Sequence, residues 1–292
     1  MVELWLPLAE PTVGPFVVPL YMPPPITVKS RKHCAKIYGI GDIHDCAAAC
    51  RIDILKYDVA HIAKEPEAKC FGMGDYFDAI GPNDHRFSPN DLPDWLQFPH
   101  IDSLWRQQVN HLYEILEPIA DKFVCLIKGN HEMKVQKLHH VDMVGDLAKM
   151  LSAKAGRDIP VFGKDAYMAL RFKRGKSIRA LTVRLYHGWS GGRMTGGRSN
   201  MLVGAMDKTD ARLTIIGHGH KPGMEKVEYD YLNTNSGRVE KVLRYAVMSG
   251  TYLARHSAKG GSYASEAGYS GSDLGVTPIL FWPDKNVIRV VE

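Results

Sequence analysis

The sequence of 292 residues lacks any apolar run long enough to cross a membrane. A membrane-spanning helix needs about 20 consecutive apolar residues, and no stretch approaches this length. The N-terminal segment, residues 1–7, has no basic region and is interrupted by proline, so it is not typical of a signal peptide. We therefore expect a cytoplasmic protein without a membrane span.

Cysteine is scarce as well, and the five cysteines are scattered along the chain. Cys70 and Cys125 lie within apolar segments, where a free thiol packs like a small hydrophobic side chain. Cys46 and Cys50 are spaced to share one face of a helix that we predict over residues 46–64. A metal-binding role for this pair is the alternative, but reduced, structural thiols are favoured.

The sequence also lacks an internal repeat and, between residues 41 and 220, any segment typical of a linker. With 45% hydrophobic residues it can fill a sizeable core. We predict one domain over residues 36–292, preceded by a proline-rich extended arm over residues 1–35.

Positive charge is in slight excess, with a net charge of +5, which permits an anionic substrate without proving one. Basic residues form two local clusters, at residues 29–33 and 171–176. Such clusters can attract phosphates or nucleic acid. The alternative is a solvated loop, and it is favoured for the second cluster, which we predict to be a turn between two strands.

What the sequence does contain is a set of five short apolar runs, each followed by residues that bind metals. Short apolar runs bounded by glycine predict buried strands. They lead into Gly41-Asp42-Ile43-His44, Gly74-Asp75-Tyr76-Phe77-Asp78, Gly129-Asn130-His131-Glu132, His187-Gly188 and Gly217-His218-Gly219-His220. In an open α/β sheet, functional groups gather beyond the carboxyl ends of the strands. The pattern therefore predicts one polar site that holds metal.

The candidate ligands supply oxygen and imidazole nitrogen but no thiolate: Asp42, His44, Asp75, Asn130, His187, His218 and His220. This set suits manganese, iron or zinc and disfavours Cu(I) or an iron–sulfur cluster. It is too large for one tetrahedral zinc ion, which takes about four ligands. Two ions about 3.5–4 Å apart could share it, and such a pair clamps the attacking and leaving oxygens of a displacement at phosphorus. We interpret the pattern as a binuclear phosphoesterase.

The ordered series GDIH, GDYFD, GNHE, HG and GHGH resembles the calcineurin-like metallophosphoesterase superfamily. The pattern of that superfamily is D-x-H, GD-x-x-[DN], GNH[ED], H and GH-x-H, and the match covers residues 41–220. The resemblance implies a four-layer α/β/β/α fold, in which a two-sheet β-sandwich is flanked by helices. The predicted strands and helices alternate in the first half of the chain, and mostly strands follow in the second half. This order agrees with that fold.

The individual elements follow from the apolar periodicity. We predict helices over residues 46–64 and 102–117. In the second half of the chain, strands are predicted over residues 166–173, 178–186, 212–216, 224–230, 240–248 and 278–282, which include the last two of the five apolar runs.

The resemblance also implies a role for each ligand. It assigns Asp42, His44 and His220 to one metal, and Asn130, His187 and His218 to the other. Asp75 would bridge the two ions, and a hydroxide held between them would attack phosphorus. Manganese is the first expectation for both ions, with iron and zinc as alternatives.

Two further residues would act on the leaving group. By resemblance, His131 donates a proton or a hydrogen bond to the departing oxygen. Asp78 would orient His131 and keep it protonated, because a carboxylate near an imidazolium raises its pKa.

The substrate is less well defined than the site. The protein Ser/Thr phosphatase branch continues its second motif with Arg-Gly, which is absent after Asp78. Residues 74–84 are similar to UDP-diacylglucosamine pyrophosphatases, but those carry GNRD where this chain has GNHE. We expect a phosphodiesterase or nuclease, with nucleic acid as one candidate substrate. The alternative is a phosphomonoesterase of small molecules or phosphoproteins. A non-catalytic scaffold of the same fold would be expected to lack some of the metal ligands. It is disfavoured, because every ligand position and His131 are filled in this sequence.

Substrate recognition has three candidate segments. Residues 81–100 form a long loop after the second motif, and long loops in compact domains are often functional. His85, Arg86 and Trp95 could contact substrate there, or the loop could simply lie on the surface. His111, on the predicted helix that follows, is expected to pack or to lie at the surface.

The other two segments are rich in glycine. After His187, glycines allow close approach of the backbone to an anion, and we expect Arg193 or Arg198 to bind phosphate. The alternative is a flexible loop whose arginines lie in water. Residues 255–275 form either a mobile flap or a slack connection between strands.

Overall fold

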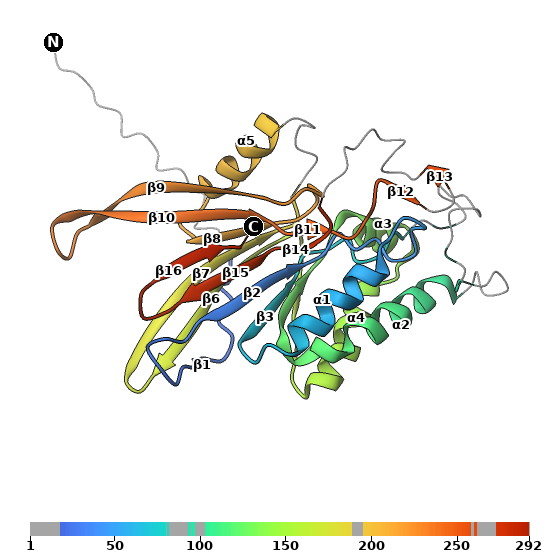
Figure 1. The fold of residues 1–292 in the computed structure, drawn as a ribbon, viewed down its shortest axis with the longest axis horizontal. Helices are drawn as coiled ribbons and strands as arrows, with labels where there is room; N and C mark the ends of the chain where they lie inside the picture. The colour runs from blue at the N-terminus through green and yellow to red at the C-terminus, as the bar shows by residue number, and fades with distance from the viewer. Residues whose placement is uncertain are drawn as a thin grey trace, which may run out of the picture.

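The computed structural model describes residues 18–79, 81, 93, 95–96, 103–188, 195–257, 260–261 and 273–291. Two six-stranded sheets lie face to face, and helices cover their outer sides (Figure 1). This architecture confirms the predicted α/β fold with two sheets flanked by helices.

The first sheet contains, in order, β16 (Val287–Val290), β15 (Pro278–Trp282), β2 (Ala35–Ile40), β3 (Ala68–Gly72), β4 (Phe123–Ile127) and β5 (Val161–Phe162). β2, β3, β4 and β5 are parallel, whereas β15 is antiparallel to its neighbours. The first three apolar runs of the sequence are β2, β3 and β4. Their carboxyl ends therefore meet at one edge of the sheet.

The second sheet contains, in order, β1 (Ile26–Thr27), β6 (Asp165–Arg174), β7 (Ser177–Tyr186), β8 (Leu213–Ile216), β10 (Arg238–Met248) and β9 (Gly223–Asn233). β7, β8 and β10 are parallel, while β6–β7 and β9–β10 are antiparallel hairpins. The two remaining apolar runs end β7 and β8. Two short ladders pair β11 (Gly250–Thr251) with β14 (Gly275–Val276) and β12 (His256–Ser257) with β13 (Gly260–Gly261).

Apolar side chains fill the space between the two sheets. Ile37 and Phe71 from the first sheet meet Leu170, Val183 and Ile215 from the second in one buried cluster. Burying each side chain of this size stabilises the fold by about 1.5–3 kcal/mol relative to leaving it in water. This core holds the strand ends of one sheet against those of the other.

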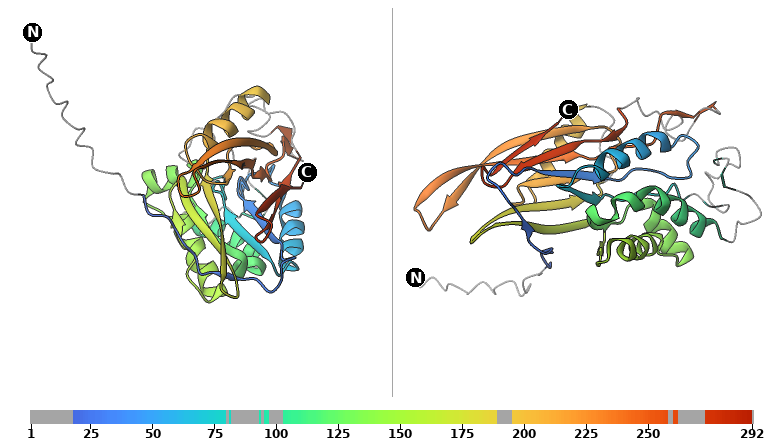
Figure 2. Two further views of the ribbon diagram at one scale, coloured as in Figure 1. Left: turned by 90° about the vertical axis from the view of Figure 1, so that its left-hand side faces the viewer. Right: turned by 60° about the horizontal axis from the view of Figure 1, so that its bottom comes forward.

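Helices cover the outer faces. α1 (Ile52–Ala63), α2 (Leu104–Leu116), the 3-10 helix η3 (Glu117–Lys122) and α4 (Met143–Ala155) pack on the first sheet through one large apolar cluster. α5 (Thr195–Met206) packs on the second sheet, where Met206 and Met248 belong to one buried cluster. Figure 2 shows α5, in gold, apart from the blue and green helices of the first sheet.

The described part of the predicted arm, residues 18–34, runs along the edge of the second sheet. β1 pairs in parallel with β6, with Thr27 opposite Lys173. Tyr21 forms an isolated bridge with Met168 farther along the same strand. The arm therefore covers an edge of β6 that would otherwise offer unpaired backbone groups to another chain.

The predicted helix over residues 46–64 is wrong in its first part, because α1 begins only at Ile52. Cys46 has a left-handed backbone with φ of 80°, which an α-helix does not accommodate. Cys50 pairs with Leu253 in an isolated bridge, so the two cysteines do not share a helix face. Burial raises the pKa of both thiols well above the usual range, as expected for packed, unreactive cysteines.

The other element predictions agree with the structure within a few residues. The predicted helix over residues 102–117 is α2, and the six predicted late strands are β6, β7, β8, β9, β10 and β15. β9 and β10 are longer than predicted, and α4 and β16 were not predicted at all. The turn predicted between two strands near residues 171–176 joins β6 to β7. Among the described residues, no helix combines the length and apolar character that crossing a bilayer requires.

Candidate metal centre

The seven candidate ligands follow strand ends of both sheets. They are Asp42 and His44 after β2, Asp75 after β3, Asn130 at the start of α3 (Asn130–His139) after β4, His187 after β7, and His218 and His220 after β8. Backbone hydrogen bonds join neighbouring strand ends. The Asp42 N–H donates to Gly74 O at 2.9 Å, and the Gly217 N–H donates to Tyr186 O at 3.0 Å. The structure thus brings together residues that are up to 178 positions apart in the sequence.

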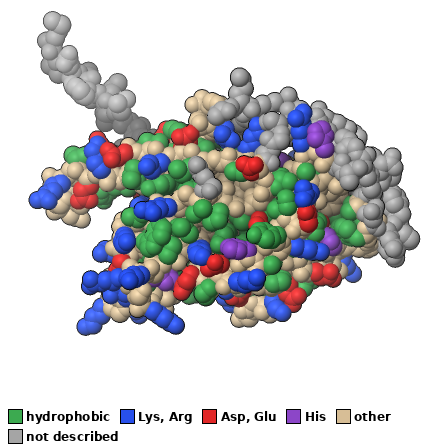
Figure 3. Space-filling view, viewed as in Figure 1, with side chains coloured by type: hydrophobic (Ala, Val, Ile, Leu, Met, Phe, Trp, Pro, Cys, Tyr) green, Lys and Arg blue, Asp and Glu red, His purple; other side chains and the backbone are tan. Residues whose placement is uncertain are grey.

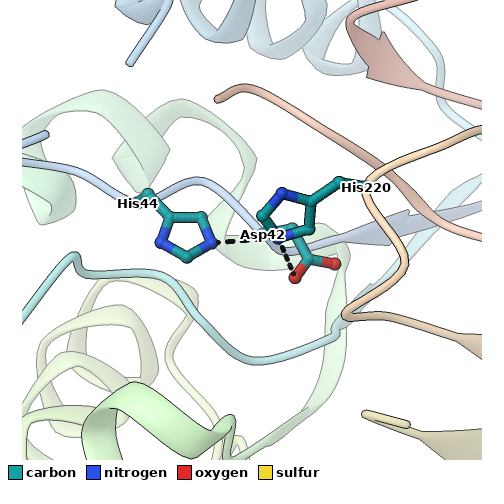
Figure 4. A group of neighbouring side chains, drawn as sticks. All are labelled: Asp42, His44 and His220. Atoms are coloured by element: carbon teal, nitrogen blue, oxygen red, sulfur yellow. Dashed lines mark hydrogen bonds and ion pairs between the residues drawn. The ribbon is translucent and has the colours of Figure 1, made fainter. Parts of the chain in front are cut away.

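Asp42, His44 and His220 form the first ligand group, with one donor atom of each within 4.8 Å of the others. Their side chains converge from two different sheets (Figure 4). His44 Nε2 lies 3.2 Å from His220 Nε2, which in turn lies 3.3 Å from Asp42 Oδ1. Burial lowers the pKa of His44, and this favours the neutral imidazole that a metal ion requires.

Asp75, His187 and His218 form the second ligand group. Asp75 Oδ2 lies 3.1 Å from His187 Nε2 and 3.8 Å from His218 Nδ1. Asn130 joins this group, because its Oδ1 lies 3.0 Å from His187 Nε2. His187 Nδ1 lies 2.7 Å from the carbonyl oxygen of Met73. That contact makes Nδ1 the donor and leaves Nε2 facing the other ligands.

The two groups are in direct contact with each other. Asp42 Oδ2 accepts the backbone N–H of His218 at 2.8 Å, so a ligand of the first group fixes a ligand of the second. The His44 N–H donates to the carbonyl oxygen of Asp75 at 3.1 Å, which links the groups a second time. Two adjacent groups of oxygen and nitrogen donors are the arrangement that a binuclear site requires.

Unpartnered polar atoms test whether these residues fit metal ions. Asp42 Oδ1, His44 Nδ1 and His218 Nδ1 are buried and form no hydrogen bond within the described part of the chain, although His220 lies at ion-pair distance, 3.3 Å, from Asp42 Oδ1. An unsatisfied buried polar group costs about 1–3 kcal/mol, so such atoms are rare in native proteins. Asp42 Oδ1 and His218 Nδ1 belong to the ligand groups, and a divalent cation would satisfy them. The donor set therefore fits divalent metals.

Backbone strain is concentrated at the same residues. Five candidate ligands have left-handed backbones with φ between 46° and 64°: Asp42, His44, Asp75, His218 and His220. This conformation costs a residue with a Cβ roughly 1–2 kcal/mol. Strained residues of this kind persist where the surrounding structure fixes them, and they cluster at functional sites.

The carboxylate of Asp75 and the imidazole of His187 are both buried, and their nearest atoms lie 3.1 Å apart. Burial alone would raise the pKa of the Asp75 carboxyl, but His187 and, to a smaller extent, His218 hold this pKa well below its usual range. Burial likewise opposes protonation of His187, yet Asp75 raises the pKa of His187 to about 9. A metal ion must displace this proton before it can bind the His187 nitrogen.

His131 lies beside both groups, at the first turn of α3. Its ring meets that of His44 edge-on, with centroids 4.7 Å apart, and its backbone N–H donates to Asp75 Oδ1 at 3.0 Å. Burial lowers the pKa of His131, but Asp75 and Asp78 outweigh this effect and raise it. His131 therefore has the charge environment of a proton donor near neutral pH.

Asp78 contacts His131 through its backbone rather than through its carboxylate. His131 Nδ1 lies 2.5 Å from the carbonyl oxygen of Asp78, so this nitrogen donates and Nε2 points away from it. The Asp78 carboxylate faces His44 instead, with Oδ1 3.6 Å from His44 Nδ1. Asp78 is thus placed to orient two imidazoles at once.

Glu132 is a structural residue that the motif comparison did not single out. Its buried carboxylate accepts backbone N–H groups of Asp75, Tyr76, Phe77 and Gly129 at 2.5–3.2 Å. It thereby fastens the first turn of α3 to the loop that carries Asp75. The sequence contained a signal for this, because Glu at the third position of a helix is typical of a capping box.

Asp45 and His111 form a second buried contact that sequence reasoning missed. Asp45 is fully buried, and its Oδ2 lies 2.9 Å from His111 Nδ1. The ring of Trp95 stacks on His111 with centroids 4.0 Å apart. Trp95, a candidate for substrate contact, therefore packs on α2 through His111.

Of the two candidate phosphate-binding arginines, Arg198 is described and Arg193 lies outside the described residues. Arg198, on α5, is half-buried, and its Nη1 donates to the carbonyl oxygen of Pro222 at 3.1 Å. This contact places Arg198 beside the loop that carries His218 and His220. His85, Arg86 and most of residues 255–275 also lie outside the described residues.

Comparison with known proteins adds little to this geometry. No protein-family model matches the chain, and no curated protein matches it. A crystal structure of a conserved uncharacterized protein from Streptococcus pneumoniae, a predicted phosphoesterase, is 13% identical and has a TM-score of 0.32. That match covers 85% of this chain and 82% of the other. A likeness this distant carries no functional information.

Proposed function

We propose that this protein is a binuclear-metal-dependent hydrolase of phosphate esters, with a preference for phosphodiesters. One observation carries the proposal: two groups of imidazole and carboxylate ligands, joined by the hydrogen bond from the His218 N–H to Asp42 Oδ2. The ordered motifs support it, because they resemble those of calcineurin-like metallophosphoesterases.

In this proposal each ligand group holds one ion. Asp42, His44 and His220 would hold the first ion, and Asn130, His187 and His218 would hold the second. Asp75 would lie between them, since it contacts the second group and its backbone carbonyl accepts the N–H of His44. When bound, divalent ions supply activation of water at neutral pH and neutralisation of charge on phosphate oxygens.

The protein's own groups would then act on the leaving group. His131 Nδ1 donates to the Asp78 carbonyl, so Nε2 is the atom that would donate a proton to a departing oxygen. The pKa of His131 is raised by Asp75 and Asp78 against the effect of burial, which favours the protonated form that this role needs. Arg198 is a candidate ligand for a substrate phosphate from the neighbouring helix, and Arg193 is a second candidate.

Two features favour a diester over a monoester. The Arg-Gly pair that grips phosphate in protein phosphatases is absent after Asp78, and the chain carries a net charge of +5. A phosphomonoesterase remains the alternative, because it would use the same ligands and the same proton donor. A non-catalytic scaffold is disfavoured, since every ligand position and His131 are filled.

The test is hydrolysis of paired chromogenic monoesters and diesters by metal-stripped protein reloaded with manganese, iron or zinc. We expect manganese to restore the most activity and the diester to be cleaved faster. The matched control is Asp75→Asn, which keeps the size of the side chain but removes its charge. Loss of activity in Asp75→Asn, with retained secondary structure, would support the binuclear site.

Two results would contradict the proposal. A protein that binds no metal at micromolar concentration, and hydrolyses neither ester, is not a metal-dependent hydrolase. Faster cleavage of the monoester would contradict the diester preference and support a phosphomonoesterase. Small phosphorylated metabolites would then be the next substrates to test.

A further inference from the structure

Two basic clusters that are about 140 residues apart in the sequence lie side by side in the structure. β1 pairs with β6 so that Thr27 faces Lys173, and the Val28 N–H donates to the carbonyl oxygen of Lys173 at 2.8 Å. Residues 29–33 therefore lie beside the end of β6 and the β6–β7 turn, which together carry the second cluster. Figure 3 shows Lys and Arg side chains gathered at the lower left, where Figure 1 places β1 and this turn.

We call this surface the basic end and define it as residues 29–33, 173–179 and 284–285. These segments contain eight Lys or Arg and one Asp or Glu, an excess larger than the net charge of +5 of the whole chain. The remainder of the protein is thus slightly acidic, and the positive charge is concentrated at one end. A concentration of charge of one sign attracts ligands of the other sign.

Most of these cations are exposed and lack acidic partners. Six are exposed and form no ion pair with any described residue: Lys29, Arg31, Lys32, Lys173, Lys176 and Arg179. The single acid, Asp284, is engaged by Arg174 at 3.0 Å. The hydrogen bond from Arg174 lowers the pKa of Asp284, and the charges of Arg31 and Arg179 lower it to a smaller extent.

The basic end is remote from the candidate metal centre. β6 begins at Asp165, beside Lys164, whose carbonyl oxygen accepts the N–H of His187 at 2.8 Å. β6 then runs its full length to Arg174 at the turn. At about 3.3 Å per residue, the two sites lie about 30 Å apart.

We propose that the basic end binds the sugar–phosphate backbone of a nucleic-acid duplex. Exposed Lys and Arg without acidic partners are the groups that neutralise backbone phosphates. Proteins that bind single strands add aromatic side chains for stacking, and residues 29–33 and 173–179 contain no Phe, Tyr or Trp. A membrane-binding tip would need several apolar side chains, whereas Ile178, at 52% exposure, is the large apolar group these segments expose in the described structure.

The separation of the two sites sets the length of ligand that can reach both. One base pair extends a duplex by about 3.4 Å, so about nine base pairs span 30 Å. If the proposed function holds and the substrate is nucleic acid, a duplex bound at the basic end could extend to the metal centre. Docking at the basic end does not itself depend on the proposed function, because it requires no metal.

The experiment measures binding of a fluorescent 24-base-pair DNA duplex to EDTA-treated protein by anisotropy, over a range of salt concentrations. The variant is Lys173→Glu with Lys176→Glu. We expect it to weaken binding at least tenfold and to reduce the slope of log K against log salt by about 2, one unit for each lost phosphate contact. A second pair, Lys32→Glu with Arg179→Glu, should give the same result, because it removes charge from both of the longer segments of the basic end, residues 29–33 and 173–179.

The matched control is Lys56→Glu with Lys226→Glu, which changes the net charge equally but lies on α1 and β9. We expect it to weaken binding less than twofold, and all variants to melt at the temperature of the wild type.

Three outcomes decide between the alternatives. Equal weakening of duplex binding by the control would overturn the proposal, because the effect would then be due to the overall charge. Unchanged duplex binding in both basic-end variants, with loss of binding to vesicles containing phosphatidylserine, would also overturn it and assign the surface to membranes. Duplex binding without any ester hydrolysis would leave the docking surface standing and refute the proposed activity alone.

Discussion

The carboxylate of Glu132 accepts a hydrogen bond from the backbone N–H of Tyr76 at 2.5 Å, across 56 positions of sequence. The same carboxylate also accepts the backbone N–H groups of Asp75, Phe77 and Gly129. One buried side chain thus fixes the backbone of the candidate bridging ligand, Asp75, and of the two residues that follow it. This relationship makes Glu132 a positioning residue.

We predict that Glu132→Gln destabilises the protein and weakens metal binding. An amide keeps the shape of the side chain but replaces one acceptor oxygen with an N–H₂ group, which would face backbone donors. The Glu132 carboxyl is ionised above its pKa of about 7, so the comparison is made above this pH. Because hydrogen bonds to charged groups contribute about 1.5–3 kcal/mol, we expect the free energy of unfolding, measured in urea, to fall by about 2–3 kcal/mol. Isothermal titration with Mn²⁺ should show at least tenfold weaker binding. Glu114→Gln, on the exposed face of α2, is the matched control and should change neither the stability nor the affinity for Mn²⁺. Equal losses in both variants would contradict a specific role for Glu132.

Gly129 is predicted to tolerate no side chain, for a steric reason. Its φ of −91° is available to any residue, so conformational freedom does not explain the glycine. A Cβ at this position would collide with the carboxylate and the backbone nitrogen of Asp75. We expect Gly129→Ala to displace Asp75 and to weaken Mn²⁺ binding by 10- to 100-fold.

The control for this substitution is Gly204→Ala on α5, where a Cβ would meet no atom within 4 Å. Replacing a helical glycine in open space should stabilise the protein by about 0.5–1 kcal/mol and leave metal binding unchanged. Retained metal affinity in Gly129→Ala would show that the loop carrying Asp75 can shift without loss of the site.

The strand ends that carry the candidate ligands could be predicted from the sequence because their signal is local. Buried parallel strands are short apolar runs, and their carboxyl ends must meet at one edge of the sheet. The conformation of the segment after β2 could not be predicted in this way. The backbone N–H groups of residues 42–45 donate to carbonyl oxygens of residues 74–76, about 30 positions away, and these bonds fix left-handed residues such as His44. A helical pattern continued backwards from α1 therefore placed residues 46–51 in a helix that long-range contacts prevent.

The role of Glu132 and the proximity of the two basic clusters also depend on long-range contacts, so they could not be predicted from local sequence patterns. The carboxylate of Glu132 acts on Asp75, Tyr76 and Phe77, which only the pairing of β3 with β4 brings near. Similarly, the alignment of Thr27 with Lys173 depends on where the arm lies on the sheet, and periodicity does not encode that position. The order of the motifs indicates candidate ligands, whereas the groups that position them depend on strand register and packing.

Metal-free protein should lose stability as the pH rises from 7 to 9.5. Asp75 raises the pKa of His187 from 6.5 to about 9 against the effect of burial, so the imidazolium–carboxylate pair stabilises the folded state fully below pH 6.5. That contribution is lost as the pH rises through 9. A shift of this size corresponds to about 3 kcal/mol, most of it lost above pH 7. Urea unfolding of EDTA-treated protein at both pH values measures it.

The matched variant for this prediction is His187→Gln, which removes the titrating group. We expect its stability to depend far less on pH across the same range, although the variant is less stable overall. Burial and Asp75 raise the pKa of Glu132 to about 7. Titration of this carboxyl therefore changes the stability mainly below pH 7, outside the range of the experiment. Wild-type stability that stays constant between pH 7 and 9.5 would show that His187 is neutral in the metal-free protein.

His131 is predicted to act as the proton donor to the leaving group. Its Nδ1 is fixed by the Asp78 carbonyl, and the pKa of the ring is raised by Asp75 and Asp78 although burial opposes this. His131→Ala should therefore slow cleavage of esters with poor leaving groups by about 10²–10⁴-fold. Nitrophenyl esters, whose leaving groups need almost no acid, should be slowed less than tenfold. His61→Ala, at an exposed position of α1, is the control and should affect neither substrate. Equal losses on both kinds of ester would instead assign His131 to substrate binding or to the integrity of the metal site, because a proton donor must discriminate between leaving groups by their basicity.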